Sequence, residues 1–236
     1  MDSNNPVFNE KTLEKLRASG ALGSATQSMT IEGAINKVGI LTVLCVGTCI
    51  LSWSMADTPT GPGIAMGSIF VALILSLVII FKKEMAPTLA PIYALVEGFA
   101  LGYISYMAEL AKPGVVMNAF IATFGILLAM IFLYRFRIIR ATERFKMGMS
   151  AALIGVMITY VADFVLGMFG HPIPFLHDSS ATGLFVSGLV IVIASLCFIL
   201  DFDMIETAAA QKAPKWMEWY AGFSVLLTLI WLRSEE

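Results

Sequence analysis

Long apolar stretches separated by short polar segments are the dominant pattern of the chain. A membrane-spanning helix needs about 20 mostly apolar residues. Seven stretches approach or reach this length, and the alternation typical of membrane β-strands is absent. The predicted spans are 38–54, 63–81, 90–107, 115–134, 147–168, 181–200 and 216–232. The pattern therefore predicts an all-α membrane protein with seven transmembrane helices, and the last span is the weakest because it includes Glu218.

Composition supports a membrane protein and excludes several other classes. Of the 236 residues, 58% are apolar and 14% are charged, against about 45–50% and about 25% in soluble domains. A soluble fold of this size cannot bury that much apolar surface, and disordered chains are rich in charge. Three cysteines are too few for a disulfide scaffold. A net charge of −2 gives no basic field for nucleic acid.

The basic residues predict how the helices are oriented. Loops that stay in the cytoplasm carry an excess of Lys and Arg. Thirteen of the 15 basic residues fall in the N-terminal segment and in the second, fourth and sixth loops, whereas Lys112 and Arg233 fall on the opposite side. We therefore expect a multi-pass protein of the plasma (inner) membrane, with a cytoplasmic N-terminus and the C-terminus outside.

The N-terminal residues predict a short arm without a cleavable signal. The first apolar stretch begins only after 37 largely polar residues, so the first span is expected to act as an uncleaved signal. We interpret residues 1–28 as a cytoplasmic arm and residues 29–236 as the transmembrane domain. With no attached soluble domain expected, the function is predicted to lie in the helix bundle.

Acidic residues inside predicted spans or directly after them are the main candidates for function. An acid near the bilayer centre costs about 2.5–3.5 kcal/mol on insertion scales. Asp201 and Asp203 project about 200° apart on one helix, so we expect one of them, Asp201, to face the bundle interior. Proton or cation transfer is one interpretation of these acids. The candidates are Glu97, Asp163, Asp201, Asp203 and Glu206.

Each acid also has a structural interpretation, which the sequence leaves open. Asp203 and Glu206 can belong to a solvated helix end near Lys212 and Lys215. Asp163 and Glu97 can accept hydrogen bonds from a neighbouring backbone or a tyrosine.

Other patterns indicate packing rather than chemistry. Small residues recur every fourth position in a stripe that lets another helix approach closely. The stripe is Ala90, Ala94, Gly98 and Gly102. No nucleophile elbow, zinc-protease motif or phosphate loop is present, and the predicted spans lack histidine. We therefore expect neither an enzyme nor a bound cofactor.

Four segments make the chain resemble a known family. They are Asn4-Asn5-Pro6-Val7, Met29 to Lys37, Ala90 to Gly98, and Leu200 to Glu206. They resemble the bacterial branch of the Bax inhibitor-1-like family, also called transmembrane Bax inhibitor motif proteins. The likeness extends from near residue 4 to about residue 232.

The resemblance implies an architecture and a function. The fold would be three two-helix layers around a central C-terminal helix. The function would be a pH-sensitive calcium leak, sensed by one acid on helix six and one on helix seven. Asp201 matches the helix-six acid, with Asp203 a close second. The helix-seven acid has no direct match: Glu235 lies near the expected position, and Asp163 or Glu97 are the alternatives.

The same resemblance supplies a basic partner and a competing function. Lys82 or Lys83 stands where the family places a base at the end of helix two. Two buried carboxylates cannot both ionise at low cost, so they share a proton. A leak needs only transient oxygen ligands, for which Asp201 and Asp203 are candidates. Calcium, protons and the lipid bilayer are then the partners.

The alternative function is that of a regulator, which binds a membrane protease or cell-death and stress machinery. For such a regulator the N-terminal arm would matter more than the acids inside the membrane.

Overall fold

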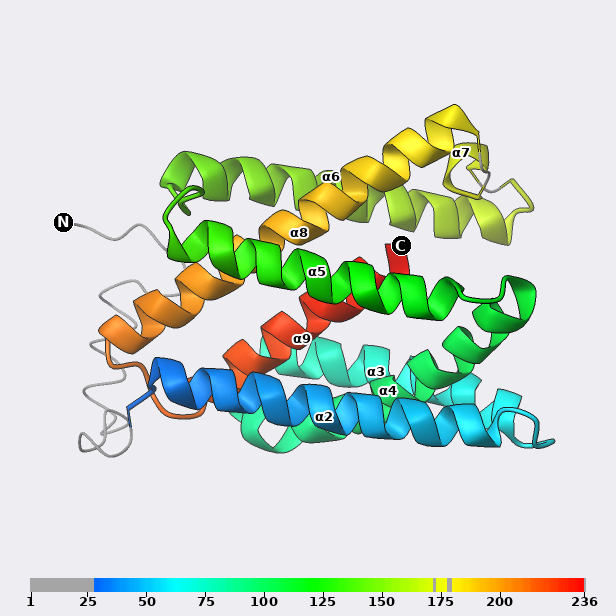
Figure 1. The fold of residues 1–236 in the computed structure, drawn as a ribbon, viewed down its shortest axis with the longest axis horizontal. Helices are drawn as coiled ribbons and strands as arrows, with labels where there is room; N and C mark the ends of the chain where they lie inside the picture. Colours follow the sequence, from blue (N-terminus) through cyan, green and yellow to red (C-terminus); the bar gives the residue numbers. More distant parts are fainter. Residues whose placement is uncertain (1–27, 172, 178–179, 236) are drawn as a thin grey trace. The chain divides into compact units, whose positions relative to one another are not determined.

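The computed structural model describes residues 28–171, 173–177 and 180–235, and this part of the chain is all α-helical (Figure 1). The predicted arm lies outside the described residues except for Ser28. Two short helical turns, η2 (Lys83–Met85) and α7 (Pro174–His177), accompany seven long helices. The long helices are α2 (Ile31–Met55), α3 (Gly61–Phe81), α4 (Ala86–Ala111), α5 (Val115–Arg135), α6 (Glu143–Met168), α8 (Ala181–Ala210) and α9 (Met217–Glu235).

Six of these helices, α2 to α6 and α8, are long and apolar enough to cross a membrane. They contain the first six predicted spans, and the multi-pass prediction is confirmed. Most helices extend beyond the predicted bounds, because hydropathy detects only the apolar part of a helix and its polar ends are helical too. The seventh helix, α9, also exists, but it starts one residue after Trp216 and is not among the six.

Local capping interactions explain where several helices begin. Thr30 accepts a hydrogen bond from the backbone N–H of Gly33 at 2.9 Å, and Thr142 accepts one from Phe145 at 3.3 Å. These side chains satisfy N–H groups that have no partner within a helix. Gly114, with φ of 86°, precedes α5 in the left-handed conformation that glycine tolerates best.

The described residues form two compact units. The first contains the described residues up to Tyr103 together with Met204–Phe223. The second contains Ile104–Asp203 and the described residues from Ser224 onward. Helices α4, α8 and α9 contribute residues to both.

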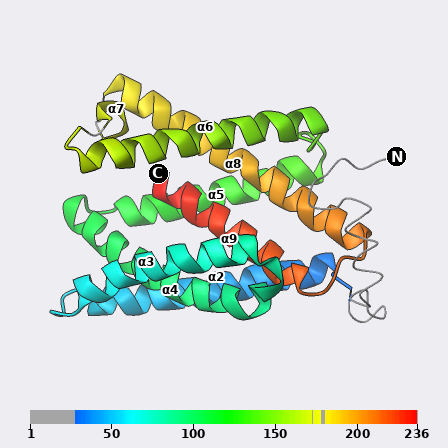
Figure 2. The same cartoon turned by 180° about the vertical axis from the view of Figure 1, so that it is seen from behind.

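In the first unit, α2 and α4 pack closely through the predicted small-residue stripe. Ala90 and Ala94 are completely buried. A Cβ atom on Gly98 would overlap the carbonyl oxygen of Cys45, and one on Gly102 would overlap that of Cys49. Figures 1 and 2 show the two helices side by side. The interpretation of the stripe as a packing surface is therefore confirmed.

The C-terminal helix α9 contacts several other helices. In the first unit, the ring of Phe223 meets that of Tyr93 from α4 edge-on at 5.0 Å, and the Lys37 ammonium of α2 lies 4.6 Å from the Trp219 ring centroid. In the second unit, α9 contacts α4, α6 and α8 through hydrogen bonds. Most of its residues are buried or half-buried. The C-terminal helix thus contacts several other helices.

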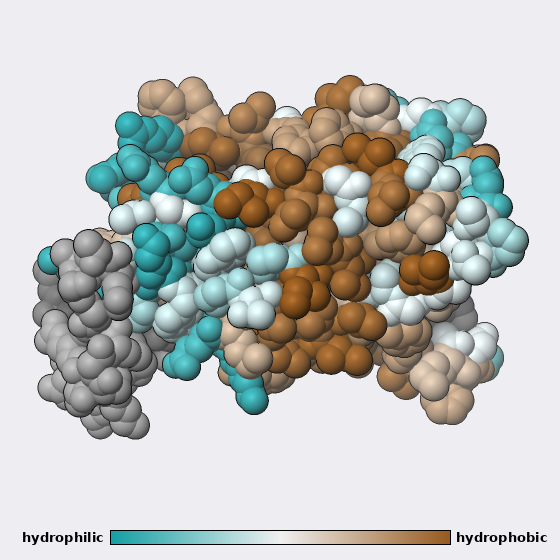
Figure 3. Space-filling model, turned by 90° about the horizontal axis from the view of Figure 1, so that it is seen from below, coloured by the Kyte–Doolittle hydropathy of each residue, from teal (hydrophilic) through white to brown (hydrophobic). Residues whose placement is uncertain are grey.

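Large apolar side chains cover the outside of the other helices. Phe81 is 82% exposed and Met168 is 73% exposed, and many more of the same kind line α2, α3, α5 and α6. Apolar side chains also cover much of the face drawn in Figure 3. Soluble monomers rarely expose apolar patches of this extent, so these surfaces face lipid.

Replacing Gly98 with alanine is expected to destabilise the protein. The added methyl group would overlap the Cys45 carbonyl and the Thr48 hydroxyl, and overpacking typically costs about 1–3 kcal/mol. Thermal unfolding of the purified protein in detergent should show a lower midpoint. Gly125→Ala is the matched control, because a methyl group there meets nothing within 4 Å. Equal midpoints for the two variants would contradict the close packing.

Candidate functional site

Asp201 lies inside the bundle, where two hydroxyl groups of α9 hold its carboxylate. It belongs to α8 and is only 7% exposed. Ser224 donates a hydrogen bond to Oδ1 at 2.5 Å, and Thr228 donates one to Oδ2 at 2.8 Å. Ser224 and Thr228 are four residues apart and therefore share one face of α9. Each carboxylate oxygen thus has its own donor.

The surroundings of Asp201 make these two hydrogen bonds important. The preceding residues Phe198 and Ile199 are completely buried. An ionised carboxylate without donors is very costly in such an interior, whereas hydrogen bonds to a charged group contribute about 1.5–3 kcal/mol each. The ionised form accepts both bonds. A protonated carboxyl must donate through one oxygen, so one hydroxyl has to turn. Protonation therefore changes the link between α8 and α9.

Asp203 lies on the other side of α8, as predicted. Its Oδ2 is 2.8 Å from the ammonium of Lys146, which also lies 3.5 Å from Glu143. Both side chains of the Asp203–Lys146 pair are partly exposed. The prediction that Asp201 faces inward and Asp203 does not is confirmed. The basic partner of Asp203 is Lys146, in the first turn of α6. Glu206, one turn further along α8, is exposed.

Two further predicted acids of the second unit have other partners. Asp163 accepts a hydrogen bond from the backbone N–H of Ile173 at 2.8 Å, a contact of the kind that its structural interpretation expects. Glu235 accepts hydrogen bonds from the Tyr160 hydroxyl and from the Trp231 indole N–H. Neither acid is among the groups that hydrogen-bond to Asp201. Among the described residues, the hydrogen-bond partners of Asp201 are therefore two hydroxyl groups.

A family model described as Bax inhibitor 1 like matches residues 5–235. This chain belongs to the Bax inhibitor 1 like family. The resemblance inferred from the sequence is confirmed, and the chain is a multi-pass membrane protein of that family. Comparisons with curated proteins and with solved structures gave no match.

The remaining predicted residues of this Bax inhibitor 1 like protein lie in the first unit. Glu97 is half-buried on α4, and in the described part of the chain no hydrogen bond or salt bridge to it is found. Lys82 is exposed, whereas Lys83 is half-buried with its ammonium 5.3 Å from the Tyr220 ring centroid. Lys83 thus contacts α9 through an aromatic ring.

Glu218 is a buried acid. In the sequence it stood out only because its charge makes the last predicted span the weakest. It is 1% exposed, and its Oε1 accepts hydrogen bonds from the backbone N–H of Thr30 at 3.1 Å and from the Thr30 hydroxyl at 3.2 Å. A Cβ atom on Gly33 would overlap the Glu218 carboxylate. An α9 side chain therefore completes the N-terminus of α2. The sequence does show an acid near the start of an apolar helix, and this signal could have singled out Glu218. It does not identify the partner Thr30, which lies 188 positions away.

Oxygen and sulfur groups that hold metals tightly do not cluster in the described residues. No group of three His, Cys, Asp or Glu residues lies close enough to share a metal ion. One carboxylate and two hydroxyl groups at Asp201 supply far fewer oxygens than the six to eight of a calcium cage. Cys45, Cys49 and Cys197 form no disulfide. Asp201 and its partners can therefore offer an ion only weak, transient ligands.

Removing the two hydroxyl groups in Ser224→Ala/Thr228→Val is expected to destabilise the protein by about 3–6 kcal/mol at pH 8, because the buried carboxylate loses both donors and each contributes about 1.5–3 kcal/mol. The loss should shrink at acidic pH, since the donors stabilise the ionised form of Asp201 most. Detergent-solubilised protein unfolded at both pH values tests this. The control is Ser195→Ala, whose hydroxyl bonds to its own helix at Ile191. A loss that is equal at the two pH values would count against the assignment.

Replacing Glu218 with alanine is expected to cost about 1–3 kcal/mol, because two partly buried hydrogen bonds from Thr30 to a charged group are lost. Glu218→Gln should cost less, since its amide oxygen still accepts. Thermal unfolding midpoints in detergent measure both. The exposed Glu84 of η2, changed to alanine, provides a control. If both Glu218 variants unfolded like this control, the carboxylate would have no anchoring role.

Proposed function

We propose that this protein is a passive, pH-sensitive calcium leak and that Asp201 is its proton sensor. The observation that carries the proposal is a carboxylate in the bundle interior with one hydroxyl donor from α9 for each oxygen. Ionisable groups inside membrane helices typically mark ion or proton pathways. Membership of the Bax inhibitor 1 like family supports the same function, because a pH-sensitive calcium leak is what the resemblance to this family implies.

The proposed gate is the link between α8 and α9. When Asp201 is ionised, both hydroxyl groups of α9 donate to it and charge strengthens both bonds. When it takes up a proton, the charge is lost and one of the two donors must turn away or accept instead. The link weakens, and α9 gains freedom to move relative to α8. Protonation therefore favours the conducting state in this proposal.

The ions would pass through weak contacts rather than a binding cage. Conduction requires that an ion enters favourably but leaves readily. Asp201 with its two hydroxyl groups provides such a contact. Asp203 provides a second when its bond to Lys146 opens, since that pair is partly exposed. No bound cofactor and no catalytic step are part of this proposal.

We also propose the orientation that the basic residues predict. With the N-terminus in the cytoplasm, the Lys146–Asp203 pair lies at the cytoplasmic end of α6 and α8. The basic segment 135–146, which leads into α6, then lies on the side where Lys and Arg accumulate. The chain would span the plasma (inner) membrane, with the C-terminal end of α9 outside.

Calcium flux into liposomes containing the purified protein tests the proposal. The wild-type flux is expected to rise as the pH falls from 8 to 5.5. Asp201→Asn should show high flux at both pH values, because asparagine cannot carry the charge. Glu84→Gln, at an exposed acid of η2, is the matched control and should retain the wild-type profile.

Two outcomes would contradict the leak. One is an Asp201→Asn variant with the wild-type pH profile, which would remove Asp201 as the sensor. The other is no flux above that of empty liposomes in any variant. In that case regulation of a membrane protease would be favoured, and deletion of residues 2–27, which leaves the Met29 to Ala213 backbone hydrogen bond in place, should abolish partner binding.

A further inference from the structure

Two basic residues lie on the side of the membrane where the predicted orientation of the helices places few Lys and Arg residues. Lys112 and Arg233 are the bases that the sequence predicts on the side opposite the other 13. Arg233, near the end of α9, donates a hydrogen bond to the Ser105 hydroxyl of α4 at 2.6 Å. Lys112 directly follows the last residue of α4. Ser105 and Lys112 are seven residues apart, or about 10 Å along one side of the helix.

The nearest acid in the sequence does not neutralise Lys112. Glu109 uses its carboxylate to cap α5: Oε1 accepts from the backbone N–H of Gly114 at 2.6 Å, and Oε2 accepts from that of Val116 at 3.2 Å. Within the described ranges, Lys112 has no salt bridge, and its side chain is exposed. The ammonium is therefore available to an anion from outside the protein.

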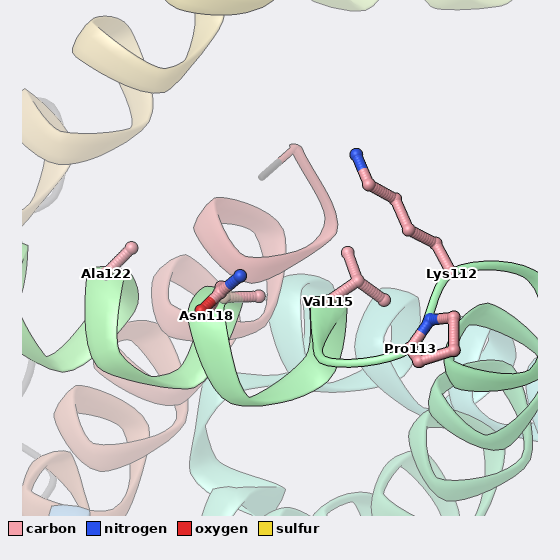
Figure 4. A pocket seen from close by; sticks show the side chains of 6 residues that line it. Lys112, Pro113, Val115, Asn118 and Ala122 are labelled. Carbon is pink, nitrogen blue, oxygen red and sulfur yellow. The ribbon is translucent and has the colours of Figure 1, made fainter.

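Lys112 forms one end of a surface pocket of about 280 Å³. The pocket is lined by Lys112, Pro113, Val115, Asn118, Ala119 and Ala122. Residues 115, 118, 119 and 122 lie on one face of α5. Figure 4 shows the long Lys112 side chain rising beside Val115, with Asn118 and then Ala122 further along the helix. The pocket is thus polar near the start of α5 and apolar beyond Asn118.

We propose that this pocket binds the headgroup phosphate of an anionic phospholipid. Lys112 supplies the charge, and the exposed Asn118 amide supplies a hydrogen-bond donor that lipid tails cannot satisfy. Ala119 and Ala122 leave a shallow apolar path for the beginning of an acyl chain. The volume is slightly below the usual range of small-molecule sites, about 300–1,000 Å³, so it accommodates the headgroup end of a lipid and not the whole molecule.

The charge of the pocket favours an anionic lipid over a zwitterionic one. A phosphatidylethanolamine headgroup brings its own ammonium, which competes with Lys112 for the phosphate. A phosphatidylglycerol headgroup has no such cation. A basic residue near an anionic lipid surface contributes about fivefold in affinity. Free phosphate offers the same oxygens without an acyl chain, so the test must separate the two sources.

Native mass spectrometry of the full chain in detergent, titrated with phosphatidylglycerol, phosphatidylethanolamine or inorganic phosphate, provides this test. Wild-type protein should bind phosphatidylglycerol most tightly. Lys112→Gln should weaken that binding about fivefold and leave phosphatidylethanolamine nearly unchanged. Ala122→Phe, which fills the apolar path, should weaken binding of both lipids. Lys212→Gln removes an exposed charge from the α8–α9 turn and should bind like wild type.

Three results would overturn the proposal. Equal effects of Lys112→Gln and Lys212→Gln would show that net charge, and not this pocket, attracts the lipid. Inorganic phosphate that displaces phosphatidylglycerol at similar concentration would identify the ligand as free phosphate. Unchanged lipid binding in Ala122→Phe would exclude the acyl path along α5. None of these results depends on whether the protein conducts calcium, so they are separable from a failure of the leak.

Discussion

Polar groups in an apolar bundle must find partners inside the protein, because lipid offers none. Helix α9 meets this requirement within each unit. In the first unit its Glu218 satisfies the N-terminus of α2. In the second its Ser224 and Thr228 satisfy Asp201 of α8. The helix carries these polar side chains because it is enclosed by other helices, and its composition is correspondingly less apolar than that of α3 or α8.

The same requirement explains which acids remain candidates for function. Asp163 bonds to a backbone N–H, and Glu235 bonds to Tyr160 and Trp231, so each has a structural role that accounts for its place. Asp203 shares a partly exposed salt bridge with Lys146. Asp201 differs from all three because its partners are two neutral hydroxyl groups. Hydroxyl groups can either donate or accept, and this freedom is what a proton-dependent contact needs.

Much of the fold could be predicted from local patterns, whereas most of the site could not. Hydropathy located the helices because length and composition are properties of a single segment. Spacing along α8 separated Asp201 from Asp203, and the four-residue repeat of small side chains identified the α4 packing face. The partners were missed because they come from distant segments. Neither Lys146 for Asp203 nor Thr30 for Glu218 leaves a mark in the sequence near the acid it meets.

The bond between Thr30 and Glu218 joins residues 188 positions apart. During synthesis, α2 is made first and α9 last, so α2 enters the membrane before the carboxylate that completes its N-terminus exists. Until then, the Thr30 N–H must be satisfied by water or by lipid headgroups. The missing side chain of Gly33 also leaves room for the Glu218 carboxylate. Arrival of the last helix therefore completes the N-terminus of the first, and a chain interrupted before α9 would leave Thr30 without this carboxylate.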